Sequence, residues 1–405
     1  METVDVLIKN ANELVTLKGP NKPRIKKQLN NLSIIKNGDL AIKDETILDV
    51  GKNLKYKSEK IINAKGKTVM PGFVDPHTHL IFAGSREFEL DMKLRGYSYL
   101  DILKKGGGIF YTVNETRKAT SEKLFKESKQ RLDKMLSYGT TTCEAKSGYG
   151  LDTDSELKIL HVQKKINSVH PVDIISTFLG AHAIPKGYSS KDYVDKIINE
   201  MIPKIKKLAN FCDVFCEKGF FTNKQSKEIL DAGKKNGLIP KIHADELSDT
   251  KGAALAAEIE AISADHLLLS NDDGLKKMAD KNVVGVLLPA TSFSLMQKNY
   301  APARKMIDLG VPVALATDLN PNCWTENMQF IIQLACLKMK MTLSEAITAS
   351  TFNAACALKM NNNIGSLEKS KQADLIILNC PNHKFLAYHY GINLIEKVIK
   401  KGCLM

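Results

Sequence analysis

Short apolar segments that end in polar residues alternate with amphipathic helical stretches through the middle of this sequence, and this pattern most limits its possible folds. The apolar runs end near His79, Lys146, Ala181, Glu217, His243, His266, Pro289 and Asp318. The helical stretches include Ser121–Ser137, Ser155–Asn167, Tyr193–Leu208, Asn223–Lys235, Lys251–Glu260 and Pro302–Gly310. Eight βα units in roughly 250 residues predict an α/β fold with a closed, TIM-like (β/α)₈ barrel, and a doubly wound open sheet is the alternative. Polar residues at the strand ends favour the barrel, because its chemistry gathers at the C-terminal ends of the strands.

The two chain ends differ from this alternating region and resemble each other. They contain short strand-like segments at Val4–Ile8, Leu40–Ile42, Thr46–Val50, Ala373–Leu378 and Val398–Ile399. Between two of these segments, Lys36-Asn37-Gly38-Asp39 predicts a hairpin turn. We therefore expect residues 1–66 and 364–405 to form one small β-sandwich domain, and residues 67–363 to form the barrel.

Charge and cysteine content limit the partners and the compartment. The net charge of +13 raises nucleic-acid binding as a distant alternative. Aromatic residues make up only 6% of the chain and do not interleave with the basic ones, so we expect no nucleic-acid partner. The eight cysteines include no CxxC pair, which favours reduced thiols over disulfides or structural zinc. We see no signal peptide and no run near the ~20 apolar residues of a membrane helix, so we predict a cytoplasmic protein without a membrane partner.

A histidine pair after the first apolar run is the strongest local signal. In Asp75-Pro76-His77-Thr78-His79, residues two apart on a strand point to one side, so both imidazoles can bind one metal ion. His243 and Asp318 each end another run, and together the four side chains make a site with three nitrogens, one oxygen and a position left for water. A metal there would lower the pKa of bound water toward 7.

Two further histidines end apolar runs, and each has two readings. His266 could be a fifth ligand, or a general base and electrophile beside the metal. His182 ends Phe178-Leu179-Gly180-Ala181 and could be either a site residue or a hydrogen-bonded core histidine.

Several motifs, taken together, resemble one known family. They are Pro71–His79, Ala83–Glu87, Gly106–Ile109, Lys146–Leu151, Leu179–Ala183, Phe211–Glu217, His243–Glu246 and Ala316–Pro321. In this order they resemble the metal-dependent amidohydrolase superfamily, and within it the members that open a cyclic amide in histidine degradation. The first motif is generic to the superfamily, whereas the others together are specific and run through the whole barrel region.

The resemblance implies a hydrolase that opens 4-imidazolone-5-propanoate to N-formimidoyl-L-glutamate, a small-molecule substrate, in a homodimer. It implies one zinc or iron ion per subunit, bound by His77, His79, His243 and Asp318. It implies catalytic roles for His266, Asp318 and Glu246: His266 would orient the nucleophile, and Asp318 would pass the water proton to the leaving nitrogen. It also implies a substrate-binding set of Arg86, Tyr149, His182, Glu246, Asn320, Asn322 and Cys323, in which Arg86 would hold the propanoate carboxylate.

Two details refine this expectation. Some superfamily members bridge two metals with a carbamylated lysine at the end of the fourth strand, but here that run ends in Cys216-Glu217, so we expect one metal. After Asn320 the chain reads Pro321-Asn322-Cys323-Trp324, where the family usually has glycine and small residues.

A deaminase of a nucleobase-like ring is the enzymatic alternative. Arg86 and Tyr149 argue against it, because a neutral base offers no carboxylate to an arginine.

Overall fold

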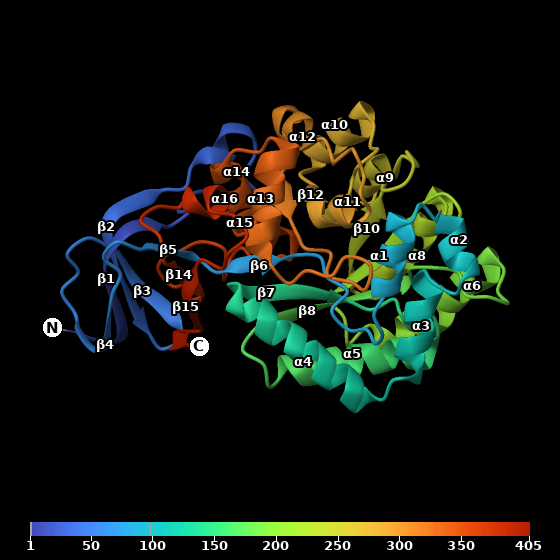
Figure 1. Cartoon of the computed structure of the whole chain (residues 1–405), viewed down its shortest axis with the longest axis horizontal. Helices are drawn as coiled ribbons and strands as arrows, with labels where there is room; N and C mark the ends of the chain where they lie inside the picture. The colour runs from blue at the N-terminus through green and yellow to red at the C-terminus, as the bar shows by residue number, and fades with distance from the viewer. Residues whose placement is uncertain (1, 98) are drawn as a thin grey trace.

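Two eight-stranded sheets organise the chain in the computed structural model, which describes residues 2–97 and 99–405 (Figure 1). One sheet is parallel, with its strands in sequence order: β6 (Phe73–Asp75), β7 (Thr140–Lys146), β8 (Asp173–Ala181), β9 (Phe211–Cys216), β10 (Ile239–Ala244), β11 (Ser263–His266), β12 (Val284–Leu287) and β13 (Val313–Leu315). Just beyond β6 and β13, the His79 N–H donates to the Leu319 carbonyl at 2.9 Å, and the Asp318 N–H donates to the His77 carbonyl at 3.1 Å. The predicted eight-stranded barrel is therefore confirmed, and its first and last strands meet at the end that carries the polar residues.

Helices connect the barrel strands and cover the outside of the barrel (Figure 1). They are α1 (Glu87–Leu94), α2 (Tyr99–Lys104), α3 (Ile109–Lys118), α4 (Ser121–Ser137), α5 (Thr153–Asn167), α6 (Ser190–Lys196), α7 (Ile202–Ile205), α8 (Asn223–Lys235), α9 (Gly252–Glu258), α10 (Asp272–Lys281), α11 (Pro289–Ser294), α12 (Ala303–Leu309), α13 (Met328–Met339), α14 (Leu343–Ala349), α15 (Phe352–Ala357) and α16 (Phe385–Tyr388). Within the described residues, none of these helices has the length and apolar character needed to span a membrane.

Local sequence explains where these helices begin and where one prediction was wrong. The side chains of Thr120 and Thr222 accept backbone N–H bonds at the starts of α4 and α8, whose predicted bounds are confirmed. The predicted helix Tyr193–Leu208 is instead broken into α6, a π-helical turn at Ile197–Met201, and α7. Pro203 lies in the first turn of α7, where its missing N–H and its ring interrupt the regular helix.

The second sheet joins both ends of the chain (Figure 1). It contains β1 (Thr3–Val15), β2 (Ile34–Lys43), β3 (Thr46–Gly51), β4 (Lys57–Asn63), β5 (Thr68–Pro71), β14 (Leu375–Leu378), β15 (Ile395–Lys400) and β16 (Cys403–Leu404). These strands are hydrogen-bonded as one mixed sheet, in the order β16-β15-β14-β5-β1-β2-β3, with β4 beside β1. A small β unit built from both chain ends is thus confirmed.

The hairpin turn expected at Lys36-Asn37-Gly38-Asp39 does not form, because β2 runs straight through it. Asn37 adopts a left-handed φ of +51° within the strand, and Gly38 pairs with Ala11 of β1. A Cβ atom on Gly38 would lie 2.7 Å from the Leu14 Cβ, so the glycine is needed for close strand packing. The chain turns between β2 and β3 instead, where Asp44 has a φ of +53°.

Candidate metal centre and active site

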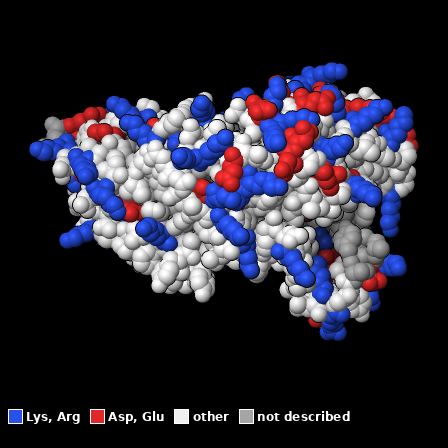
Figure 2. Space-filling model, turned by 90° about the horizontal axis from the view of Figure 1, so that it is seen from above, with Lys and Arg blue, Asp and Glu red and all other residues white. Residues whose placement is uncertain are grey.

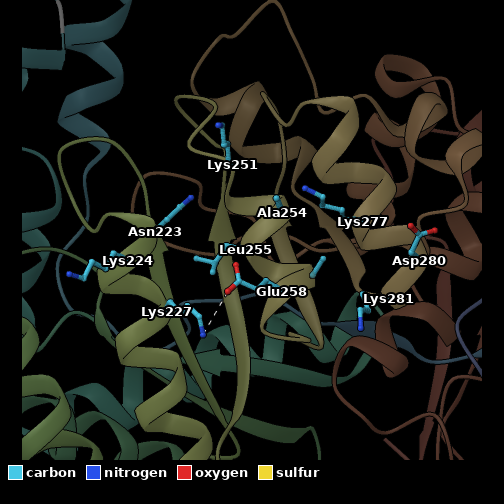
Figure 3. Close-up of a pocket in the computed structure, with 11 residues that line it drawn as sticks. Asn223, Lys224, Lys227, Lys251, Ala254, Leu255, Glu258, Lys277, Asp280 and Lys281 are labelled. Atoms are coloured by element: carbon cyan, nitrogen blue, oxygen red, sulfur yellow. Dashed lines mark ion pairs between the residues drawn. The ribbon is translucent and has the colours of Figure 1, made fainter.

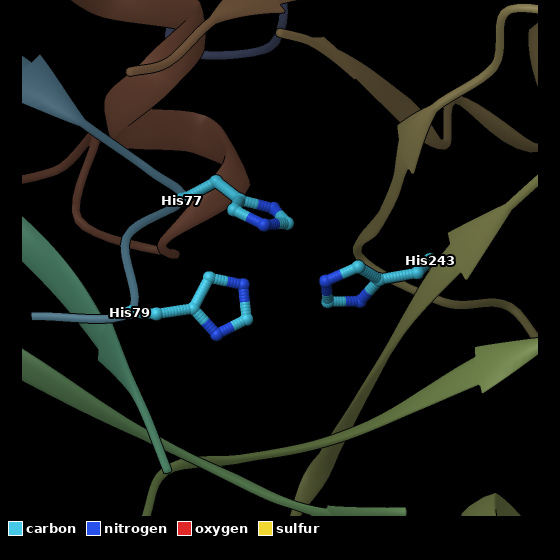
Figure 4. Close-up of side chains that lie close together, drawn as sticks. All are labelled: His77, His79 and His243. Carbon is cyan, nitrogen blue, oxygen red and sulfur yellow. The ribbon is translucent and has the colours of Figure 1, made fainter. Parts of the chain in front are cut away.

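Three histidines converge at the C-terminal ends of the barrel strands (Figure 4). His77 and His79 follow β6, His243 lies in β10, and all three are buried. The ring centroids of His77 and His243 are 4.6 Å apart, and those of His77 and His79 are 5.3 Å apart. One ring nitrogen of each histidine lies within 4.8 Å of the others. The structure therefore brings these predicted ligands together in one buried cluster.

Asp318 lies beside this cluster, just after β13. Its Oδ1 is 3.5 Å from the Nε2 atoms of both His77 and His79, and its Oδ2 accepts a 2.6 Å hydrogen bond from the Thr291 hydroxyl. Burial raises the pKa of Asp318 to about 6, against the opposing effect of the Thr291 hydrogen bond. The backbone φ of Asp318 is +53°, a left-handed conformation that non-glycine residues adopt mainly where the surrounding structure enforces it, as at functional sites.

The geometry of these four side chains fits a single metal ion. Two ligand atoms about 2.1 Å from a tetrahedral zinc ion are about 3.4 Å apart, close to the spacing between Asp318 and the two histidines. Among the described atoms, the Nε2 atoms of His77 and His243 are buried without a hydrogen-bond partner. Leaving a buried polar atom unsatisfied costs about 1–3 kcal/mol, a cost that coordination would remove. The donor set therefore suits zinc or iron.

Carboxylates lie beside the other nitrogens of two of these histidines. His77 Nδ1 lies 2.6 Å from Asp265 Oδ2, and His243 Nδ1 lies 3.1 Å from Asp213 Oδ2. The His77 contact is a hydrogen bond that fixes the orientation and the tautomer of the ring, so that its Nε2 faces the cluster, whereas His243 Nδ1 lies close to Asp213 without forming a hydrogen bond.

Two buried lysines neutralise these carboxylates. Lys146, the last residue of β7, places Nζ 2.6 Å from Asp213 Oδ2, 3.4 Å from Asp265 Oδ2 and 2.9 Å from Glu144 Oε2. Lys241 Nζ lies 2.9 Å from the other Glu144 oxygen. Burial alone would lower the pKa of Lys146, but the three carboxylates raise it above its usual range. Counted together with Asp318, the carboxylates outnumber the two ammonium groups by two, so a divalent cation at the histidines would balance their charge.

A second close group, His77, Glu144 and Asp265, could hold a metal by distance alone. Both oxygens of Glu144 already face lysine ammonium groups, which favours the three-histidine position for the ion. Strand β9 ends at Cys216 and contains no lysine, in keeping with the expectation of one metal.

His266 and Glu246 lie on one side of the histidine cluster. The His266 ring centroid is 5.3 Å from that of His243, and its Nε2 is 3.6 Å from Glu246 Oε2. Burial lowers the pKa of His266 well below its usual value and raises the pKa of Glu246 to about 8. In the absence of a metal, both side chains therefore favour their neutral forms at neutral pH.

His182 and Tyr149 form the opposite wall. The His182 ring stacks on His79 with centroids 4.9 Å apart, and its Nδ1 lies 3.1 Å from the Gly148 carbonyl oxygen. The Tyr149 ring is 5.3 Å from that of His182 and 5.6 Å from that of His79. Burial lowers the pKa of His182 to about 3 and raises the pKa of the Tyr149 phenol.

Arg86 lies farther out, at the start of α1, and its guanidinium is already engaged. Its Nε and Nη2 atoms donate to the two carboxylate oxygens of Glu89 at 2.7 and 2.8 Å. Arg86 lines a cavity with Asn322, Cys323 and Trp324. The predicted substrate-binding residues thus fall into two neighbouring groups, one around the histidines and one around this cavity.

The loop that follows Asn320 is held in shape by the Asn320 side chain. Its side-chain Oδ1 accepts hydrogen bonds from the N–H groups of Asn322 and Cys323, and its Nδ2 donates to the Asp318 carbonyl at 2.7 Å. The Asn320 side chain therefore points into the loop that follows it, and its hydrogen bonds connect that loop to Asp318.

Sequence reasoning missed the residues that support the site. Glu144, Asp213, Lys241 and Asp265 are charged residues within otherwise apolar strands, and burying a charge is costly unless it is paired. This signal was visible in the sequence. Glu89, by contrast, has the sequence appearance of an ordinary surface helix acid.

The positive surface charge is dispersed. Figure 2 shows basic and acidic side chains mixed over one face of the molecule. A groove beside α8, α9 and α10 is rich in lysines (Figure 3), but Lys227 lies 2.8 Å from Asp231 and Lys277 lies 2.7 Å from Asp273. Because these two ammonium groups and that of Lys281, 3.1 Å from Glu260, have carboxylate partners, only part of the positive charge in the groove is free to attract a polyanion.

Comparisons with known proteins agree with this geometry. The amidohydrolase family profile matches residues 68–404. The chain is 52% identical to the imidazolonepropionase of Alkaliphilus metalliredigens, covering 99% of this chain and 98% of that protein, and 50% identical to the imidazolonepropionase of Geobacillus kaustophilus, covering 98% and 97%. A zinc-bound adenosine deaminase from Xanthomonas campestris shares the fold, with a TM-score of 0.75 at 16% identity over 100% of this chain and 93% of that one. The chain therefore belongs to the amidohydrolase family and, within it, to the imidazolonepropionases.

Proposed function

We propose that this protein hydrolyses 4-imidazolone-5-propanoate to N-formimidoyl-L-glutamate, using one zinc or iron ion held by His77, His79, His243 and Asp318. The convergence of these four side chains at the barrel mouth, in a chain about half identical to imidazolonepropionases, is the observation that carries the proposal. A bound ion supplies Lewis acidity and lowers the pKa of water at neutral pH.

The protein's own residues then move one proton from water to the ring nitrogen. Asp318 accepts the water proton on a carboxylate oxygen and later releases it, acting first as a general base and then as a general acid. His266, in its neutral form, orients the attacking water or donates to the oxyanion that develops on the ring carbonyl oxygen. Glu246 and His182 hydrogen-bond the ring nitrogens, and Glu246 relays the proton held by Asp318 to the nitrogen that leaves as the ring opens.

The outer residues bind the side chain of the substrate. Arg86 holds the propanoate carboxylate with the part of its guanidinium that Glu89 leaves free, and Tyr149 closes the wall beside the ring. Asn320, Asn322 and Cys323 form the loop on the remaining side. A nucleobase deaminase would use the same metal ligands, but its neutral substrate offers no carboxylate to the guanidinium of Arg86.

Turnover of substrate generated in place tests this proposal. Urocanate and urocanase would supply the unstable imidazolone, and formation of N-formimidoylglutamate would be followed with metal-loaded and metal-stripped protein. We expect product only with the loaded protein and recovery of activity when zinc or iron is restored. A folded, metal-loaded sample that leaves the imidazolone to decay at its uncatalysed rate, yet deaminates a compound from a nucleobase panel, would replace the proposal with the deaminase alternative.

Replacing Glu246 by glutamine should lower kcat about 100-fold, because a positioned proton donor or acceptor typically contributes at least that factor. The amide keeps the size of the side chain but cannot exchange a proton with the ring nitrogen. Glu258→Gln, on the exposed part of α9, is the matched control and should leave kcat unchanged. A kcat for Glu246→Gln within threefold of the wild-type value would remove Glu246 from the proton path.

A further inference from the structure

The cavity next to the histidine cluster contains a cation that the proposed reaction has not used. Lys93, one helical turn after Glu89 on α1, lines the same cavity as Arg86 and Asn322. It is partly buried, and its Nζ donates a 2.7 Å hydrogen bond to Asn322 Oδ1. Among the described residues, no carboxylate lies within ion-pair distance of this ammonium group, whereas Arg86 has Glu89 as a bidentate partner.

Arg86 alone therefore offers less charge to a substrate carboxylate than its side chain implies. Glu89 is buried, takes two of the guanidinium N–H groups and also accepts the Gly108 N–H at 2.7 Å, so this pair is fixed and electrically neutral as a unit. Glu87, on the rim of the cavity, binds the Ser85 hydroxyl. An anion that enters the cavity thus meets a neutral Arg86–Glu89 pair, the exposed Glu87 carboxylate and the partly buried ammonium group of Lys93. Among the described residues, Lys93 has no carboxylate within ion-pair distance, and Glu89 acts on it only at longer range.

Asn322 connects this ammonium group to the reaction site. The Asn322 N–H is held by Asn320, and the Asn320 side chain donates to the Asp318 carbonyl. The hydrogen bond from Lys93 to the Asn322 side chain therefore places Nζ relative to a proposed metal ligand, through a short and largely buried chain of contacts.

We propose that Lys93 is a specificity-determining residue that binds the substrate carboxylate together with Arg86, and that Asn322 positions its ammonium group. This inference rests on the proposed function, since it assigns the cation that recognises the propanoate group of that substrate. Lys93 would distinguish imidazolones that carry an acidic side chain from those that carry a neutral one of the same size.

Lys93→Met tests the proposal, with Lys93→Arg as the charge-conserving variant and Arg95→Met as the matched control. Arg95 lies on the same stretch of chain but is exposed and pairs with exposed Asp91 at 2.9 Å. Steady-state kinetics would use substrate generated from urocanate. Inhibition constants would be measured for two stable probes, 3-(imidazol-4-yl)propanoate and its uncharged primary amide.

For Lys93→Met, we expect KM and the inhibition constant of the acid to rise about 10- to 100-fold, the range for losing one charge-assisted hydrogen bond. The inhibition constant of the amide and kcat should stay within threefold, because neither depends on a carboxylate. Lys93→Arg should recover most of the affinity for the acid, and Arg95→Met should match the wild type. An unchanged thermal midpoint would show that Lys93→Met is folded.

Two results would overturn the role of Lys93 while leaving the proposed function intact. The first is wild-type turnover together with an unchanged acid-to-amide ratio in Lys93→Met. The second is equal weakening of acid and amide, which would make Lys93 a structural support for the loop. Absence of turnover by the metal-loaded wild type would instead reject the proposed function itself.

Discussion

Replacing His243 by alanine is expected to lower kcat/KM for the imidazolone by more than about 1,000-fold and to leave the purified protein with little bound metal. His243 is the one proposed ligand on β10, and its Nε2 is a buried atom without a hydrogen-bond partner among the described residues. The variant removes a metal donor, and it also leaves Asp213 without the imidazole that lies 3.1 Å away. Because the reaction needs water of lowered pKa, loss of the ion removes the nucleophile rather than weakening it.

Metal content per chain, measured by elemental analysis after dialysis, checks this prediction alongside the kinetics. His161→Ala is the control, because His161 is exposed on α5, on the outside of the barrel. Circular dichroism of the two variants would show that the barrel is folded. A His243→Ala protein with a full metal complement and wild-type turnover would show that the ion binds elsewhere. The group of His77, Glu144 and Asp265 would then be the first candidate for the metal site.

The sequence was sufficient to predict the barrel and the histidine cluster because both depend on local periodicity. An apolar strand followed directly by His77-Thr78-His79 places both rings at one end of the barrel, and the closed sheet then brings His243 and Asp318 to the same end. None of these inferences required knowledge of a specific contact between distant residues.

The contacts that support the site could not be predicted in the same way. Lys146 on β7 meets Asp213 on β9 and Asp265 on β11, which are alternate strands of the barrel. Side chains of alternate strands share a layer inside such a barrel, so their pairing depends on strand tilt and register rather than on neighbouring residues. The ion pair of Arg86 with Glu89 is a local i,i+3 contact at the start of α1, but the burial of Glu89 depends on how that helix packs against the rest of the chain.

The second prediction concerns this buried layer of Lys146, Asp213 and Asp265. Replacing Lys146 by methionine should lower the free energy of unfolding by about 3–5 kcal/mol. Methionine has nearly the length of lysine, so packing changes little. The variant leaves Glu144, Asp213 and Asp265, all fully buried, with only Lys241 as an ammonium partner. Each unpaired carboxylate must then take up a proton or draw water into the barrel, and both options cost free energy in the folded state only.

Urea denaturation of metal-free protein measures this effect without a contribution from ion binding. The control is Lys129→Met, which breaks an exposed pair with Asp133 on α4 and should cost at most about 1 kcal/mol.

The double variant Lys146→Met/Asp213→Asn distinguishes two causes of the loss of stability: the missing attraction of the Lys146 ammonium group and the unpaired charge of the buried carboxylates. If the penalty comes from unpaired carboxylates, removing one of them should restore part of the stability in the Lys146→Met background, whereas Asp213→Asn alone should destabilise the wild type. If Asp213→Asn destabilises the wild type and the Lys146→Met variant equally, Lys146 stabilises the barrel through packing. The buried carboxylates beside His77 and His243 would then have to be neutralised by protonation instead.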